Sequence, residues 1–239
     1  FKVYESLKQD SAKQLIPLSI HEILQNGISV IDGILYDCGK KVCSVLRVKS
    51  LLGSYNHQNI SAVYGVLKTL GKPFVLDNIM SFKGLPHRQE YVAHKDNVTF
   101  INDSKATNIT STLRALSCYD AVHLVLGGIA KDSGLSGIEQ EKKSIVHGYV
   151  FGEATEQFSR ELSEKGIPHF CFKTMKEATQ KAACAAFSES AHTAKKSTVL
   201  LSPACSSFDQ FKDFEHRGEA FKSVVHDLIN QQEGSLSHG

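Results

Sequence analysis

After residue 88 the chain alternates short apolar segments with longer segments whose apolar residues recur at helical spacing, and this alternation constrains the fold more than any other feature. Each such helix returns the chain across one face of a sheet before the next parallel strand begins. The expected strands are 98–101, 122–126, 145–151, 169–172 and 198–201, and the expected helices are 108–116, 155–165, 176–187 and 215–229. The sequence therefore predicts an α/β fold with a doubly wound, mostly parallel sheet.

The first 84 residues have a different pattern, with short segments rich in β-forming residues at 15–19, 28–31, 34–36 and 42–48. Asp32-Gly33 between two apolar runs predicts a β-hairpin, and apolar residues at helical spacing predict a helix over 61–70. Lys83–Arg88 contains Gly84 and Pro86, which commonly mark a boundary. We therefore expect two domains, 1–84 and 85–239.

Composition excludes several classes of function. The chain has 239 residues and is 41% hydrophobic, which is enough for a substantial core. Its 27 basic and 25 acidic residues give a net charge of +2 without a long basic run, so nucleic acid is not an expected partner. No apolar run approaches the roughly 20 residues that cross a bilayer, so no membrane partner is expected either. The six cysteines, at 38, 43, 118, 171, 184 and 205, form no Cys-x-x-Cys pair and suggest reduced, mostly buried thiols of a cytoplasmic protein.

Polar side chains follow three of the predicted strands. Asp103, Lys105 and Thr107 lie in the turn after 98–101, Lys131 follows 122–126, and Ser207 follows 198–201. Carboxyl ends of parallel strands meet at one edge of a sheet, where the following helices offer free backbone N–H groups to an anion. The sequence therefore predicts a ligand site at this edge.

Simpler roles exist for most of these residues. Thr107, Asn108 and Ser207 are of the types that cap helices, and Lys131 alone would be an ordinary surface lysine. Lys105 is harder to explain in this way, because capping has no use for an ammonium group. Asn56 and Asn59 precede the helix predicted over 61–70, and three-residue spacing would place them on one helical face, either to bind one ligand or to cap the helix.

Several catalytic motifs are absent from the sequence. It contains no Gly-x-x-x-x-Gly-Lys-Ser/Thr phosphate loop, and without Gly-x-Gly-x-x-Gly a Rossmann-like sheet does not imply NAD. It also lacks the Gly-x-Ser-x-Gly elbow and the His-Glu-x-x-His metal pair. Covalent catalysis and metalloprotease chemistry therefore have no support.

Three segments, Leu85–Arg88, Ile101–Asn108 and Leu201–Gly218, closely resemble the Mur ligases, and Asp-Ser-Lys-Ala-Thr-Asn resembles in particular the MurD-type branch, which adds D-glutamate to UDP-N-acetylmuramoyl-L-alanine. The resemblance covers nearly the whole chain but only the carboxyl-terminal part of such an enzyme. It implies that 1–84 is the end of an α/β ATPase domain and that 85–239 is a Rossmann-like C-terminal domain.

The resemblance also implies a reaction and its site. Such ligases use ATP to convert a substrate carboxylate into an acyl phosphate, which the incoming amine attacks, and they serve peptidoglycan synthesis, cell shape and division. The implied catalytic residues are Lys105 and Lys131. The implied D-glutamate site is Thr107, Lys131, Ser207 and Phe214, and the implied nucleotide site is Asn56, Asn59, Arg88, Asp103 and Lys105. Tyr55 departs from the histidine usual before the first asparagine.

We further expect a cytoplasmic, monomeric enzyme whose phosphate loop and Mg²⁺ ligands lie in a preceding part absent from this chain, and therefore no activity from this chain alone. Two alternatives belong to other classes. One is a non-catalytic module that binds a nucleotide or an amino acid, and the other is an unrelated Rossmann-like oxidoreductase. Binding of D-glutamate, ATP analogues or NAD discriminates among the three.

Overall fold

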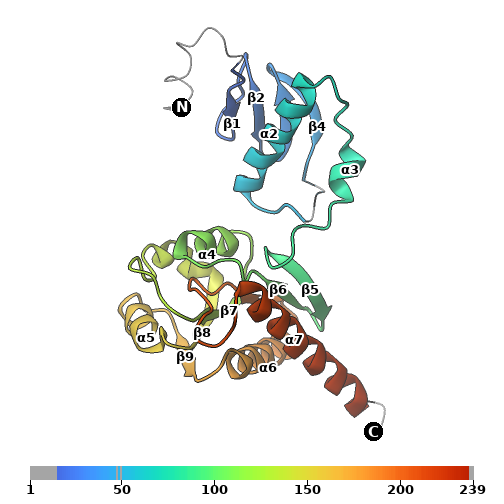
Figure 1. The fold of residues 1–239 in the computed structure, drawn as a ribbon. Helices are drawn as coiled ribbons and strands as arrows, with labels where there is room; N and C mark the ends of the chain where they lie inside the picture. The colour runs from blue at the N-terminus through green and yellow to red at the C-terminus, as the bar shows by residue number, and fades with distance from the viewer. Residues whose placement is uncertain (1–14, 47, 49, 237–239) are drawn as a thin grey trace. The chain divides into compact units, whose positions relative to one another are not determined.

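The computed structural model describes residues 15–46, 48 and 50–236. It contains two compact units, Phe1–Lys83 and Gly84–Gly239 (Figure 1). The division in the sequence falls one residue before the predicted domain boundary. Among the described residues, no helix has the length and apolar character needed to span a membrane.

The first unit contains a four-stranded sheet in the order β1-β2-β3-β4. Its strands are β1 (Leu18–Ser19), β2 (Ile28–Ile31), β3 (Ile34–Asp37) and β4 (Lys40–Ser44), of which β1 and β2 pair in parallel and the others antiparallel. Asp32 and Gly33 have φ of 48° and 69°, as a two-residue turn between twisted strands requires. The predicted hairpin is therefore confirmed.

Helix α2 (Ser54–Thr69) packs Ile60 against Ile28 and Val30 of the sheet, and α3 (Leu76–Met80) follows it. The predicted start at residue 61 was wrong. The polar first turns of α2 hide its periodicity, and its N-terminus is at Gly53, whose φ of 87° is unavailable to most residues. The strand predicted over 42–48 is also shorter, because β4 ends at Ser44, and residue 47 lies outside the described residues.

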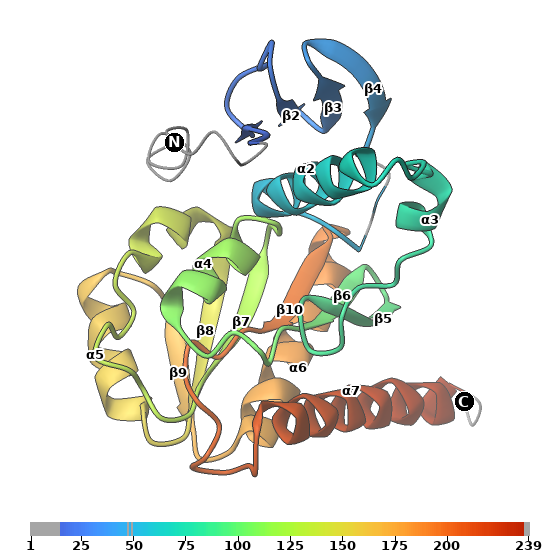
Figure 2. The same ribbon diagram turned by 45° about the horizontal axis from the view of Figure 1, so that its top comes forward.

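The second unit contains a six-stranded sheet in the order β5-β6-β10-β7-β8-β9 (Figure 2). Only β5 pairs antiparallel to its neighbour, so the predicted α/β fold with a mostly parallel sheet is confirmed. The strands are β5 (Glu90–Lys95), β6 (Val98–Asn102), β7 (Val122–Gly127), β8 (Ile145–Phe151), β9 (His169–Phe172) and β10 (Ser197–Leu201).

Helices cover both faces of this sheet (Figures 1 and 2). They are α4 (Ile109–Leu116), α5 (Thr155–Glu164), α6 (Met175–Thr193) and α7 (Phe214–Leu236), with a 3₁₀ helix η1 (Ile138–Ser144). On the α4 and α5 face, Leu124 and Leu200 lie in one core with Phe158. On the α6 and α7 face, Val125 and Val199 lie in a second core. Alternate residues of each central strand thus face opposite cores, as strand geometry requires.

Strand β5 was not predicted. Asp96 and Asn97 join it to β6 in a two-residue turn, with φ of 48° and 63°. Asn and Asp tolerate this left-handed conformation, but without a glycine the turn signal in the sequence is weak.

All six cysteines are free, but the expectation that most are buried was wrong. Only Cys205 is buried, and Cys38, Cys171 and Cys184 are exposed. Cys171 lies on the edge strand β9, which is a position that composition alone cannot identify.

Candidate functional site

Five of the predicted site residues, Asp103, Lys105, Thr107, Lys131 and Ser207, lie in the loops after β6, β7 and β10. These three strands are neighbours in the sheet. We use "carboxyl rim" for the three loops that follow them, residues 103–108, 202–209 and 128–131. Backbone hydrogen bonds connect these strand ends directly. The Asp103 N–H donates to the Leu201 carbonyl at 2.8 Å, and the Gly127 N–H donates to the Pro203 carbonyl at 3.0 Å.

Asp103 is the most strongly perturbed acid of the carboxyl rim. It is 5% exposed, and its Oδ2 accepts a hydrogen bond from Ser202 Oγ at 2.8 Å while its Oδ1 accepts one from the Gln89 N–H at 3.1 Å. Burial raises the pKa of Asp103 to about 7, although both hydrogen bonds and the charge of Arg88 act in the opposite direction. A buried carboxylate with two donors keeps lone pairs for a further donor.

Arg88 lies between two residues in the left-handed region, His87 (φ 61°) and Gln89 (φ 46°). Its own side chain is exposed, whereas His87 is 5% exposed and has Nδ1 3.0 Å from Asn102 Nδ2. The His87 ring packs directly on Gly218 of α7, where an added Cβ would lie 2.1 Å from His87 Nδ1. The segment that carries Arg88 is thus held against both β6 and α7.

Lys105 and Thr107 lie in the loop after β6. The Lys105 ammonium is exposed and lies 4.0 Å from the centroid of the Phe214 ring. Asn108 is the N-cap of α4, since its side chain accepts a hydrogen bond from the Ser111 N–H. Asn108 is therefore the residue that caps α4, and Thr107, whose side chain is half-buried, is not.

The loops that carry Lys131 and Ser207 are joined by an antiparallel bridge. The Ile129 N–H donates to the Ser206 carbonyl at 3.0 Å, and the Ser206 N–H donates to the Ile129 carbonyl at 3.1 Å. Ser207, which is 2% exposed, adjoins this bridge, and the exposed Lys131 lies two residues beyond it. The bridge thus brings together two loops that are far apart in the sequence.

Arg217, which the sequence analysis did not select, is completely buried beneath the carboxyl rim. Its Nη2 donates to the carbonyls of Ser104 at 2.8 Å and Cys205 at 3.1 Å, and its Nη1 reaches the Gly127 carbonyl at 3.5 Å. Burial lowers the pKa of Arg217 to about 10, so it remains a cation at neutral pH. A signal for it exists, because Arg217 shares helical spacing with the buried Phe221 and Val225 on the apolar face of α7.

Asn56 and Asn59 lie in the first turns of α2, in the first unit, and share one helical face. Asn59 Nδ2 donates to Asn56 Oδ1 at 3.1 Å, and Asn56 Nδ2 donates to the Leu52 carbonyl at 2.7 Å. Asn56 is buried and Asn59 is exposed, so Asn59 is the one that can reach a ligand.

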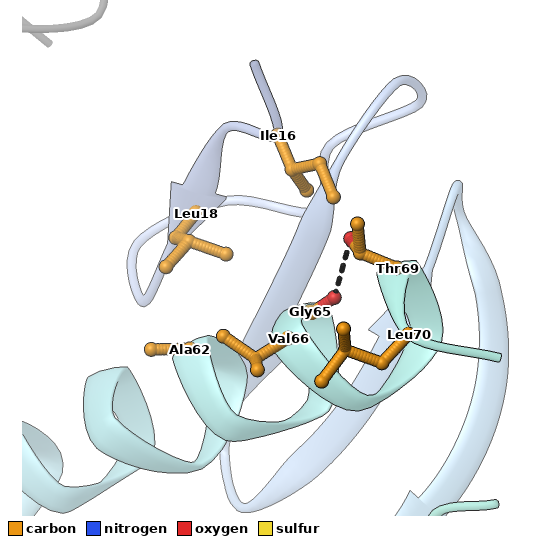
Figure 3. A pocket seen from close by; sticks show the side chains of 7 residues that line it. All are labelled: Ile16, Leu18, Ala62, Gly65, Val66, Thr69 and Leu70. Atoms are coloured by element: carbon orange, nitrogen blue, oxygen red, sulfur yellow. Dashed lines mark hydrogen bonds between the residues drawn. The ribbon is translucent and has the colours of Figure 1, made fainter. Parts of the chain in front are cut away.

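The first unit also has a groove of about 380 Å³ between β1 and α2 (Figure 3). Its lining is mainly apolar, and includes Leu18, Val66 and Leu70. Thr69 supplies a hydroxyl, which donates to the Gly65 carbonyl at 2.9 Å. None of the predicted site residues lines this groove. Among the described residues, no group of three or more His, Cys, Asp or Glu side chains is placed to hold a metal ion.

Comparison with known proteins finds relatives by sequence and by structure. No protein-family model matches the chain. The UDP-N-acetylmuramoylalanine--D-glutamate ligase of Paramagnetospirillum magneticum is 39% identical over 214 residues, which are 89% of this chain and 46% of that protein. The enzyme of the same name from Rhodospirillum rubrum is 35% identical over 243 residues, which are 99% of this chain and 50% of that protein.

Solved structures share the fold at low sequence identity. MurF from Acinetobacter baumannii matches with a TM-score of 0.61 and 15% identity, over 95% of this chain and 49% of that one. UDP-N-acetylmuramate-alanine ligase MurC from Thermotoga maritima matches with a TM-score of 0.56 and 15% identity, over 82% of this chain and 43% of that one. The chain spans about half the length of the curated relatives it matches, and by sequence it is a homologue of the UDP-N-acetylmuramoylalanine--D-glutamate ligases.

Proposed function

We propose that this chain is the D-glutamate- and nucleotide-binding portion of an ATP-dependent ligase that adds D-glutamate to UDP-N-acetylmuramoyl-L-alanine in peptidoglycan synthesis. Such an enzyme would act as a cytoplasmic monomer in cell-wall growth, cell shape and division. Relatives that are 35–39% identical and bear this enzyme's name support the proposal. We further propose that the first unit is the end of an ATPase domain and the second a C-terminal domain.

The observation that carries the proposal is the Ile129–Ser206 bridge. D-Glutamate has two carboxylates, and an enclosed site must meet both with cations or hydrogen-bond donors. Through the bridge, the loop of Lys131 brings an ammonium group and the loop of Ser207 brings a hydroxyl and N–H groups. We assign Lys131 and Ser207 to the carboxylates of D-glutamate, with Thr107 and Phe214 as neighbouring contacts.

Asp103 and Arg88 are suited to bind the nucleotide. A buried carboxylate with spare lone pairs can accept hydrogen bonds from ribose hydroxyls, and an exposed guanidinium beside it can bind phosphate. Asn59, with Asn56 behind it, is a further candidate for the nucleotide. ATP would supply the chemistry by activating a carboxylate as an acyl phosphate, and Lys105 and Lys131 would offset the negative charge that develops there. We assign no residue of this chain to Mg²⁺.

Calorimetric titration of the chain with D-glutamate, L-glutamate, ATP and NAD tests the proposal. We expect binding of D-glutamate and ATP, weaker binding of L-glutamate, and none of NAD. Asp103→Ala should lower the affinity for ATP and leave the affinity for D-glutamate unchanged, because we assign the carboxylate to the nucleotide. Binding of NAD in place of ATP would instead favour an oxidoreductase. Unchanged ATP affinity in Asp103→Ala would contradict the assigned role of Asp103.

A further inference from the structure

Lys105 and Phe214 were expected to serve different ligands, yet they contact each other. The Lys105 ammonium lies 4.0 Å from the centroid of the Phe214 ring, which is within the range of a cation–π interaction. Among the described residues, no carboxylate lies within ion-pair distance of Lys105. The ring of Phe214 is thus the partner that the structure gives to this cation.

The backbones of both residues are fixed by hydrogen bonds. The Lys105 N–H donates to the His87 carbonyl at 3.0 Å, and Ser104 Oγ donates to the Phe214 carbonyl at 2.8 Å. Arg217 Nε lies 3.0 Å from the same Ser104 Oγ and is fully buried. The start of α7 is therefore tied to the loop after β6, and the ring is presented to the ammonium by a rigid frame.

The ring itself has a packed neighbour. His87 meets it edge-on, with ring centroids 6.2 Å apart and planes at 79°. A lysine side chain has four rotatable bonds and ordinarily samples many rotamers at a surface. A fixed aromatic face restricts that sampling and keeps the Lys105 ammonium over the Phe214 ring, at the start of α7.

We propose that Phe214 is a positioning residue, whose ring holds the Lys105 ammonium in place so that it can meet a phosphate group bound at the carboxyl rim. The phosphate part of this inference rests on the proposed function, whereas the contact between ring and ammonium does not. In this role Phe214 affects phosphate binding through Lys105, in addition to the contact with D-glutamate proposed above. Fixing a cation before the ligand arrives lowers the reorganisation that binding requires.

The contact can be tested by NMR on the chain after reductive methylation of its lysines with ¹³C-formaldehyde. Methyl groups above an aromatic face are shifted upfield, and Lys105→Arg assigns the Lys105 signal. We expect Phe214→Leu to remove this upfield shift and Phe214→Trp to keep it. Phe170→Leu changes a half-exposed phenylalanine on the distant edge strand β9 and should leave the signal unchanged. A Lys105 signal that Phe214→Leu does not move would overturn the proposal.

The effect on phosphate is tested by a double-mutant cycle on ATP affinity. Phe214→Leu should weaken ATP by about two- to fivefold, which is the change that a cation–π contact at an exposed site corresponds to. Phe214→Trp should restore the affinity. In a Lys105→Gln background, Phe214→Leu should have no further effect. An equal loss in both backgrounds would mean that Phe214 acts independently of Lys105, and would overturn the positioning role.

The two arms separate this inference from the proposed function. A wild-type chain that binds no ATP would remove the support for the ligase assignment, whereas the ring-current shift would still decide whether Phe214 holds Lys105. Circular dichroism of each variant establishes that the fold is retained, and Phe214→Trp keeps an aromatic ring at the position if Phe214→Leu fails to fold.

Discussion

At the scale of single residues, the buried carboxyl of Asp103 makes the stability of the chain depend on pH. Its pKa is raised to about 7 because its burial disfavours the charged form. The folded chain therefore holds this proton more tightly than the unfolded chain, in which the pKa is close to 4. The stability that Asp103 contributes is complete below pH 4, and it is lost as the pH rises through 7.

Asp103→Asn should remove this pH dependence. Between pH 5 and pH 8 the wild-type chain should lose about 2–3 kcal/mol of unfolding free energy through Asp103, and the variant should lose correspondingly less. Urea unfolding of both proteins at the two pH values measures this loss. Subtracting the loss in the variant from the loss in the wild type cancels the contributions of all other titrating groups. An identical pH dependence in the two proteins would show that Asp103 ionises normally.

Lys131 gives a residue-scale prediction about ligand choice. Hydrogen bonds to charged groups contribute about 1.5–3 kcal/mol each, so Lys131→Ala should weaken D-glutamate by roughly ten- to a hundredfold. Affinity for ATP should hardly change. NMR titration of the chain with each ligand is suitable because it measures weak binding. Lys142→Ala is a matched control, since its ammonium contacts the Lys165 carbonyl instead of the carboxyl rim. If Lys131→Ala lowers the affinity for ATP and leaves the affinity for D-glutamate unchanged, Lys131 is a nucleotide ligand.

At the scale of elements, the contact between α7 and the segment before β5 depends on the absence of one side chain. A Cβ on Gly218 would lie 2.1 Å from His87 Nδ1. Overpacking of this kind costs about 1–3 kcal/mol, so Gly218→Ala should lower the unfolding free energy of the second unit by that amount. Urea unfolding of the variant provides the measurement.

A second background, His87→Ala, tests whether the His87 ring causes this loss of stability. In a His87→Ala background the obstructing ring is gone, and Ala is the better helix former by about 1 kcal/mol. Gly218→Ala should then stabilise the chain. If Gly218→Ala destabilises both backgrounds equally, the His87 ring is not the cause.

The sequence predicted most elements of the second unit because local pattern and fold agree there. Strands β8 and β9 were predicted with their observed ends, since apolar runs in a parallel sheet are bounded by polar turns. Strand β5 and the start of α2 were missed where the local signal is weak. Asp96-Asn97 lacks a glycine, and the first turns of α2 are polar.

The candidate site could be predicted only in part, for a similar reason. Polar residues after strands are visible in the sequence, but strand order is not, so the adjacency of β6, β10 and β7 had to come from the structure. Arg217 and His87 act through contacts with segments far away in the sequence. Helical spacing places Arg217 on the apolar face of α7, but it does not reveal the distant groups that either side chain contacts.

At the scale of the whole chain, we predict no ATP-dependent ligation by these 239 residues alone. The sequence contains no Gly-x-x-x-x-Gly-Lys-Ser/Thr loop with which to cradle the transferred phosphate. The measurement is phosphate release in the presence of UDP-N-acetylmuramoyl-L-alanine, D-glutamate and ATP, compared with a reaction that lacks the chain. Product above that background would refute the prediction.

The bridge between Ile129 and Ser206 has a consequence for hydrogen exchange. The N–H of each residue donates to the carbonyl of the other, at 3.0 Å from Ile129 and 3.1 Å from Ser206. Neither amide can reach solvent unless the two loops separate, and when they separate both are released together. We therefore expect the two amides to have equal protection factors in deuterium exchange, and D-glutamate to slow both by the same factor. Unequal slowing would show that the loops open independently and that the ligand restrains only one of them.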